Sequence, residues 1–136
     1  MRSMWLVLAS VMLLATLPAK AQDGYPSKQV TVIVPFAAGG TADILARMVA
    51  DHLSSVFKQQ FFVENRAGAG GMIGAASVAT AAPDGYTLVV SGVASHVIAP
   101  AMAANPSFDP VRDFTHIAYL GGPPKYATCV KSFSAS

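Results

Sequence analysis

Cysteine and charge are both scarce in this sequence. Among its 136 residues there is one cysteine, Cys129, and 12% of the residues are charged. A single cysteine excludes an internal disulfide, and it also excludes a zinc site built from several cysteines. The histidines His52, His96 and His116 lie far apart and lack metal-ligand spacing. The sequence therefore predicts neither a metal centre nor a disulfide framework.

Long apolar stretches are also rare. Residues 4–17 form a run of fourteen mostly apolar residues, which is too short to cross a bilayer comfortably. Arg2 precedes this run, and Ala19-Lys20-Ala21 follows it as a small-residue cleavage site. This order is typical of a secretory signal peptide, with a membrane anchor as the alternative. We expect residues 1–21 to be cleaved on export, and an exported chain without disulfides fits the bacterial periplasm.

The basic excess of the whole sequence does not extend to the expected mature chain. Of nine Lys and Arg residues, Arg2 and Lys20 lie within residues 1–21, whereas all seven Asp and Glu residues follow that segment. The mature chain therefore has a formal charge of zero. It also has no basic cluster interleaved with aromatic residues, so the sequence argues against a nucleic-acid partner.

The most informative stretch predicts a strand, a glycine turn and the start of a helix. Residues 30–36 are mostly apolar and β-branched, as in a strand covered on both faces. Gly39 and Gly40 allow a sharp turn with a bare backbone. Thr41 is the expected helix cap, and Asp43 suits the first helical turn. Unpaired N–H groups at such a helix start favour an anion without needing a charged side chain.

The rest of the chain repeats the alternation of strands and helices. We expect helices over about 42–57 and 72–82, the second with Ile73 and Val78 facing inward, and a weaker helix running to about 104 that Pro100 shortens. Further strands are expected at 61–64, 86–91 and 114–120, with a short one around 127–130. The apolar stripe expected to bury the first helix comprises Ile44, Leu45, Met48, Val49, Leu53, Val56 and Phe57.

This alternation predicts an α/β fold with a mostly parallel sheet. Small-residue turns follow the first three strands, at residues 36–41, 68–74 and 91–95. The carboxyl ends of parallel strands meet at one edge of the sheet, where ligands of open α/β sheets bind. The sequence therefore predicts that the three turns converge on a small-anion site.

Cofactor and catalytic signatures are weak. The glycines of residues 68–74 miss the G-x-G-x-x-G spacing because position 73 is isoleucine, and no phosphate-binding P-loop is present, so no cofactor is expected. Ser95 and His96 are sequence neighbours, an arrangement that seldom gives the geometry of a nucleophile and its base. Cys129 lies in an apolar segment and is interpreted as a buried, inert thiol. A secreted α/β hydrolase-like enzyme using Ser95 or Cys129 remains the alternative from another class.

Three runs of sequence carry a resemblance to a known family: YPSKQVTVIVPFAAGGTADILAR, VENRAGAGGMIGAASVATAAPDGYTLVVSG, and HVIAPAM followed by FDPVRDFTHIAYLG. The chain resembles the Bug family, the TctC-like periplasmic solute-binding receptors of tripartite tricarboxylate transporters. The resemblance implies a periplasmic-binding-protein-like lobe of type II, one half of a Venus flytrap. It also implies a non-enzymatic monomer that captures a small carboxylate or related solute and delivers it to a two-component membrane permease.

The resemblance also implies which residues form the site. Family members hold a carboxylate largely through backbone N–H groups and ordered waters. Met72 stands where many members have a polar residue. Carried over by position, the ligand-binding residues are Phe36, Ala38, Gly39, Gly40, Thr41 and Asp43 in the first loop, Ala69, Gly70, Gly71 and Met72 in the second, and Ser91, Gly92, Ser95 and His96 in the third.

Family members are more than twice as long as this chain. The resemblance therefore implies a signal peptide at 1–21, the N-terminal part of the first solute-binding lobe at 22–124, and a diverged or truncated tail at 125–136. A flytrap needs two lobes to enclose its ligand, so we expect an incomplete lobe with impaired binding. A non-functional receptor fragment is the remaining alternative.

Overall fold

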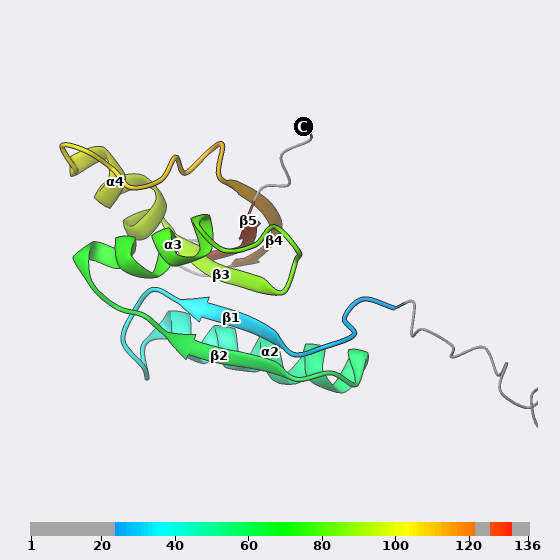
Figure 1. The fold of residues 1–136 in the computed structure, drawn as a ribbon. Coiled ribbons are helices and arrows are strands. Elements are labelled where there is room, and N and C mark those ends of the chain that lie inside the picture. The colour runs from blue at the N-terminus through cyan, green and yellow to red at the C-terminus, as the bar shows by residue number, and fades with distance from the viewer. Residues whose placement is uncertain (1–23, 122–125, 132–136) are drawn as a thin grey trace, which may run out of the picture.

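The computed structural model describes residues 24–121 and 126–131, so the expected signal peptide and half of the expected tail lie outside the described residues. These residues form a five-stranded sheet in the order β2-β1-β3-β5-β4, with helices against both faces (Figure 1). The elements are β1 (Val30–Val34), α2 (Thr41–Phe57), β2 (Phe61–Asn65), η1 (Ala69–Gly71), α3 (Met72–Ala79), β3 (Thr87–Gly92), η2 (Ala94–Ile98), α4 (Ala99–Met102), β4 (Phe114–Gly121) and β5 (Tyr126–Lys131).

The sheet is parallel in one half and antiparallel in the other. β1 pairs in parallel with β2, where Val30 lies opposite Phe61, and with β3, where Thr31 lies opposite Thr87. β5 pairs antiparallel with both β3 and β4. Only residues 122–125 separate β4 from β5, too few for the crossover that a parallel pair needs. The expected parallel sheet is therefore confirmed for the first three strands, whereas the sheet as a whole is mixed.

Alternation along β1 divides the core into two layers. Val30, Val32 and Val34 face α2, whereas Ile33 faces α3. The side chains of β3 alternate in the same way, with Leu88 and Val90 in the layer beside α2 and Val89 in the layer beside α3. Because side chains alternate along a strand, a strand buried on both faces reads as a continuous apolar run. Figure 1 shows α2 and α3 on opposite sides of these strands.

The bounds expected for α2 are confirmed, but its predicted buried stripe is partly wrong. The residues turned to the sheet include Ala42, Asp43, Ala46 and Ala50. Of the large apolar residues expected there, Leu45, Val49 and Leu53 are half-buried, whereas Ile44, Met48, Val56 and Phe57 are exposed. Alanines every fourth residue let the helix axis lie close to the sheet, and this close approach turns the larger side chains to the flank.

Three other local predictions need correction. Thr41 does not cap α2, because the N-cap is Gly40 and no side chain bonds to the helix start. Helix α3 ends at Ala79, and Ile73 is exposed although Val78 is fully buried. Ser95 and His96 lie within the wide helical turn η2 and not in a loop before it.

An apolar cavity of about 180 Å³ opens beside α2. It lies between α2 and the strands β1, β3 and β4. Its walls are Val32, Ala46, Val49, Leu53, Leu88, Ile117, Ala118 and Leu120. Within the described residues, no helix has the length and apolar character needed to cross a membrane.

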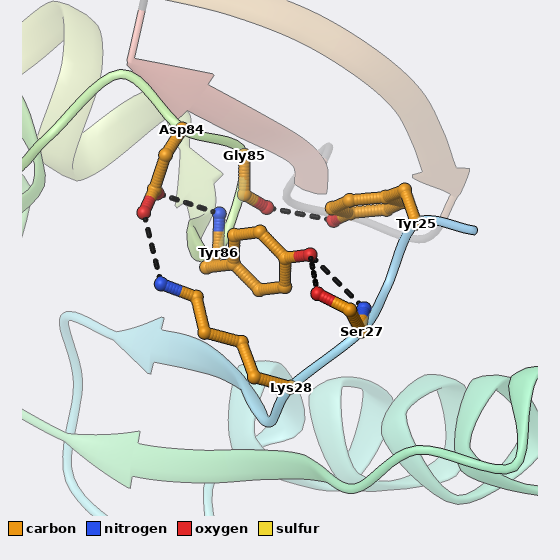
Figure 2. Close-up of polar contacts among 6 residues, drawn as sticks. All are labelled: Tyr25, Ser27, Lys28, Asp84, Gly85 and Tyr86. Atoms are coloured by element: carbon orange, nitrogen blue, oxygen red, sulfur yellow. Dashed lines mark hydrogen bonds and ion pairs between the residues drawn. The ribbon is translucent and has the colours of Figure 1, made fainter. Parts of the chain in front are cut away.

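The segment before β1 is tied to the start of β3 by a group of contacts that we call the clasp, formed by residues 25–28 and 84–86 (Figure 2). The Tyr25 hydroxyl donates to the carbonyl oxygen of Gly85 at 2.7 Å, and the Ser27 N–H donates to the Tyr86 hydroxyl at 3.0 Å. Lys28 pairs with Asp84 at 3.3 Å, and its Nζ lies 4.4 Å from the centre of the Tyr86 ring. The clasp therefore holds the edge of the sheet opposite the glycine turns.

Candidate functional site

Three loops meet at the carboxyl ends of β1, β2 and β3, as the parallel pairing requires. A Cβ atom placed on Gly71 of the second loop would lie 2.6 Å from the Cβ of Ser95 and 3.3 Å from the carbonyl oxygen of Pro35. A Cβ on Gly70 would lie 3.1 Å from the Cβ of Ala99. These close approaches bring the second loop against the first and the third. The predicted convergence of the three turns on one edge is therefore confirmed.

The first loop presents its backbone to solvent. Ala38, Gly39, Gly40 and Thr41 are exposed, and Phe36 is half-buried with its ring 6.4 Å from that of Tyr126. Gly39 has a φ of +81°, a conformation that glycine adopts without strain. The first turn of α2 carries N–H groups that no side chain caps. This helix start is thus an electropositive backbone surface at the edge of the sheet.

Asp43 lies beneath this loop with its carboxylate fully engaged. The side chain is buried, and its oxygens accept hydrogen bonds from the Gly39 N–H at 2.8 Å, Arg47 Nε at 3.1 Å and Asn65 Nδ2 at 3.0 Å. The Arg47 hydrogen bond, followed by that from Gly39, lowers the pKa of Asp43 to about 2 although burial opposes the shift. Asp43 is therefore ionised at neutral pH.

The second loop curls through four successive residues with positive φ, which are Gly68, Ala69, Gly70 and Gly71. Ala69 and Gly70 are exposed, Gly71 is buried, and Met72 is half-buried at the start of α3. Three glycines in this segment remove the strain that side chains would cause in the left-handed region. Gly74 also admits no side chain, because its Cβ would lie 2.7 Å from the Arg66 carbonyl oxygen and 2.9 Å from Pro35 Cα.

The third group of predicted residues faces into the protein. Ser91, Gly92, Ser95 and His96 are all buried. The Ser91 hydroxyl donates to the carbonyl oxygen of Ala127 at 3.1 Å and lies 3.2 Å from Cys129 Sγ. The Ser95 hydroxyl bonds to the backbone N–H and carbonyl of Gly92, both at 3.2 Å. These side chains tie β3 to β5 and to η2, so they support the edge from within.

Ser95 and His96 do touch, contrary to what their adjacency in sequence suggested, with Ser95 Oγ 3.1 Å from His96 Nδ1. Ser95 is fully buried, however, and the His96 ring packs against Phe108 and Phe114. Burial, with a smaller effect of His116, lowers the pKa of His96 to about 4. His96 Nε2 has no hydrogen-bond partner among the described residues. A nucleophile in this position has no contact with solvent through which a substrate could arrive.

Cys129 is the buried thiol that the sequence predicts. Its side chain is fully enclosed, and burial raises the pKa of the thiol above its ordinary value. Because the thiolate is the reactive form, a raised pKa makes Cys129 a poor nucleophile at neutral pH.

Two residues of the site edge, Arg47 and Asn65, were not predicted from the sequence. Arg47 Nη2 donates to Asn65 Oδ1 at 3.0 Å, and Asn65 Nδ2 donates to the Phe36 carbonyl oxygen at 3.2 Å. Weak signals existed for both. Arg47 lies four residues after Asp43 on the same helix, and Asn65 ends the second strand at the edge where the turns converge.

Relatives of this chain include bacterial proteins about three times as long as the segment that matches. The chain is 46% identical over 114 residues to a UPF0065 protein of Agrobacterium vitis encoded in the TAR-I ttuE-ttuC' intergenic region, covering 82% of this chain and 33% of the relative. It is 38% identical over 104 residues to Protein BugT of Bordetella pertussis, covering 75% of this chain and 32% of BugT. The chain thus spans about a third of the length of these curated relatives.

Solved structures show the same fold. MatC (Rpa3494) from Rhodopseudomonas palustris with bound malate matches with a TM-score of 0.67 and 42% identity, over 71% of this chain and 33% of MatC. R. palustris Rpa4515 with adipate matches with a TM-score of 0.68 and 38% identity, over 71% of this chain and 32% of Rpa4515. The described residues therefore have the fold of a segment of these proteins, as they do of the periplasmic binding protein BugD.

The family model described as "Tripartite tricarboxylate transporter family receptor" matches residues 45–132. This match covers more than half of the chain and agrees with both sets of relatives. The chain belongs to the tripartite tricarboxylate transporter receptor family, TctC.

Proposed function

We propose that this chain supplies the solute-binding edge of a periplasmic receptor that takes small carboxylates. The observation that carries the proposal is the convergence of three small-residue loops at one edge of the sheet, where the first loop leads into the uncapped start of α2. A helix start with free N–H groups binds an anion through backbone dipoles, without a charged side chain. Two relatives of the same fold are known with malate and with adipate, both of which are dicarboxylates.

The proposed receptor is a binding protein and not an enzyme. Its ligand contacts would come from the first two loops, chiefly from the exposed backbone of residues 38–41 and 69–70. Met72 and Phe36 would line the site with apolar surface, while Ser91, Gly92, Ser95 and His96 would hold the third loop in place from within. Asp43 would support the first loop by accepting the Gly39 N–H.

Family membership supports the wider setting of the proposal. Residues 1–21 would direct export to the periplasm, and residues 22–124 would form the N-terminal part of the first lobe, with 125–136 as its tail. The receptor would work as a monomer and deliver its solute to a two-component membrane permease. No nucleic acid, metal or cofactor has a role in this proposal.

A single N–H group can be removed to test the proposal. Proline is favoured at the first position of a helix, and the preceding Gly40 already has the extended conformation that proline requires, with φ −78° and ψ 168°. Thr41→Pro therefore deletes the Thr41 N–H with little strain, whereas Thr41→Ala keeps it and serves as the matched control. Because Thr41 does not cap the helix, both variants should remain as stable as the parent chain.

Binding is best followed by amide chemical shifts, which detect millimolar affinities. Malate and adipate should shift the amides of residues 38–42 saturably, and their neutral diamides should not. Thr41→Pro should weaken binding about tenfold, the loss of one charge-assisted hydrogen bond, while Thr41→Ala binds as the parent does. Absence of saturable shifts in the parent chain with either dicarboxylate would count against the proposed function.

A further inference from the structure

Three polar side chains lie beneath the first loop around the buried Asp43, and we call Asp43, Arg47 and Asn65 the brace. It joins three separate pieces of the site edge. Asn65, at the end of β2, donates to the Phe36 carbonyl oxygen that follows β1 and to Asp43 Oδ1 in α2. Asp43 in turn accepts the Gly39 N–H at 2.8 Å. The loop is therefore held at residues 36 and 39 from below.

The brace also determines the charge beneath the loop. The Arg47 guanidinium grips Asp43 as a fork, with Nη2 3.0 Å from Oδ1 and Nε 3.1 Å from Oδ2. The side chain of Asp43 is 5% exposed, so its charge is little screened by water, whereas that of Arg47 is 50% exposed. A lone carboxylate in this place would repel any anion bound at the start of α2. The paired guanidinium cancels that repulsion.

We propose that Asp43, Arg47 and Asn65 are positioning residues, which shape the first loop and keep it electrically neutral so that it accepts anionic solutes. In this arrangement Asp43 does not touch the solute, and Arg47 acts through Asp43. The assignment of a charge role to Arg47 rests on the proposed function, whereas the shaping of the loop does not.

The shaping role is tested in the ligand-free protein by amide hydrogen exchange at Gly39. Asp43→Ala removes the acceptor of this N–H, so its exchange should rise about tenfold or more while β1 stays protected. Asn65→Ala provides a second variant, because it frees the Phe36 carbonyl and should also loosen the loop. Asp84→Asn is the control, since it changes an aspartate at the opposite edge of the same sheet. Unchanged Gly39 exchange in folded Asp43→Ala and Asn65→Ala would overturn the shaping role.

The charge role is tested at pH 7 with two probes, the dianion malate and the monoanion lactate. Arg47→Gln leaves Asp43 uncompensated, so malate affinity should fall about tenfold and lactate affinity by about half as much on a logarithmic scale. The double variant Asp43→Asn/Arg47→Gln is neutral again and should regain most of the malate affinity. If Arg47 merely stabilised the fold, adding Asp43→Asn to Arg47→Gln would not restore malate binding, because it would remove a further stabilising interaction.

The remaining outcomes separate the two claims. If Arg47→Gln weakens malate binding and the double variant does not restore it, Arg47 contacts the solute directly and the charge role is wrong. If Asp43→Asn alone abolishes malate binding while Gly39 exchange is unchanged, Asp43 is itself a ligand contact. If neither probe binds the parent chain, the proposed function and the charge role fail together, and Gly39 exchange alone decides whether the brace shapes the loop.

Discussion

The two edges of the parallel strands are held by similar chemistry in different surroundings. At the loop edge, the brace pairs Arg47 with Asp43, whose side chains are 50% and 5% exposed. At the opposite edge, the clasp pairs Lys28 with Asp84, whose side chains are 63% and 42% exposed. An exposed ion pair is worth about 0–1 kcal/mol, whereas breaking a buried one costs several times as much. The loop edge is therefore the more sensitive of the two to substitution.

The difference follows from what each edge has to hold. The clasp joins two extended segments through several independent contacts, including the Tyr25 and Tyr86 hydroxyls (Figure 2), so the loss of one contact leaves the others. The loop edge must hold glycine-rich backbone in left-handed conformations, which costs conformational entropy that only specific buried contacts offset. Four substitutions test this comparison, ordered by the size of the effect expected.

Gly74→Ala should have the largest effect. The new Cβ would lie 2.7 Å from the Arg66 carbonyl oxygen and 2.9 Å from Pro35 Cα, and backbone atoms cannot move aside cheaply. We expect a loss of about 3 kcal/mol or more in the free energy of unfolding, measured by urea denaturation. Gly40→Ala is the matched control, because its Cβ meets only the Ala37 carbonyl oxygen at 3.4 Å. Equal midpoints for the two variants would contradict the close packing of the second loop.

Acid should destabilise the loop edge through His96. Its pKa is about 4 in the folded protein against an ordinary value of 6.5, so the unfolded state binds the proton more readily. The contribution of neutral His96 to the free energy of unfolding is therefore fully present above pH 6.5. It is lost as the pH drops toward 4, which lowers the free energy of unfolding by as much as about 3 kcal/mol. His96→Phe, which keeps an aromatic ring beside Phe108 and Phe114, should flatten this dependence. His52→Gln, at an exposed histidine, is the control variant. If the pH dependence of stability persists in His96→Phe, a group other than His96 causes it.

Asp43→Asn should cost about 2 kcal/mol at neutral pH. The folded pKa of about 2 lies below the ordinary 3.8, so ionised Asp43 stabilises the fold above pH 3.8, and this contribution is lost as the pH falls through 3.8 to 2. The difference between variant and parent should therefore vanish near pH 2. Thermal unfolding at a series of pH values measures it, and a pH-independent difference would point to lost packing and not to lost charge.

Lys28→Met should have the smallest effect, about 1 kcal/mol or less, because the charge that it removes is exposed both in the ion pair with Asp84 and over the Tyr86 ring. High salt should abolish even this difference, since exposed charges are screened. Urea denaturation with and without about 0.5 M salt, at which the Debye length is about 4 Å, measures it. A cost equal to that of Asp43→Asn would remove the distinction between the two edges.

Much of the fold and part of the site could be predicted from the sequence. Runs of β-branched residues marked β1 and β3, and glycines marked the turns after β1 and β2, because both signals are local. Which face of α2 is buried could not be read in this way, since the alanines at 42, 46 and 50 compete with larger residues for the sheet. The hydrophobic pattern favours the larger side chains, whereas close packing selects the smaller ones.

The strands, the helices and the glycine turns could thus be predicted from the sequence, because each depends on the backbone preferences of neighbouring residues. The common edge of the turns followed from the alternation of strands and helices, which indicates parallel strands. Three features depend instead on how the elements pack: β5 pairs antiparallel with β3, Ser91 and Ser95 turn inward, and Asp43 contacts Asn65. Asp43 and Asn65 are 22 residues apart, and their contact exists because α2 packs across β2 and brings the two ends together. Contacts between distant residues depend on how whole elements pack, and no local pattern encodes that packing.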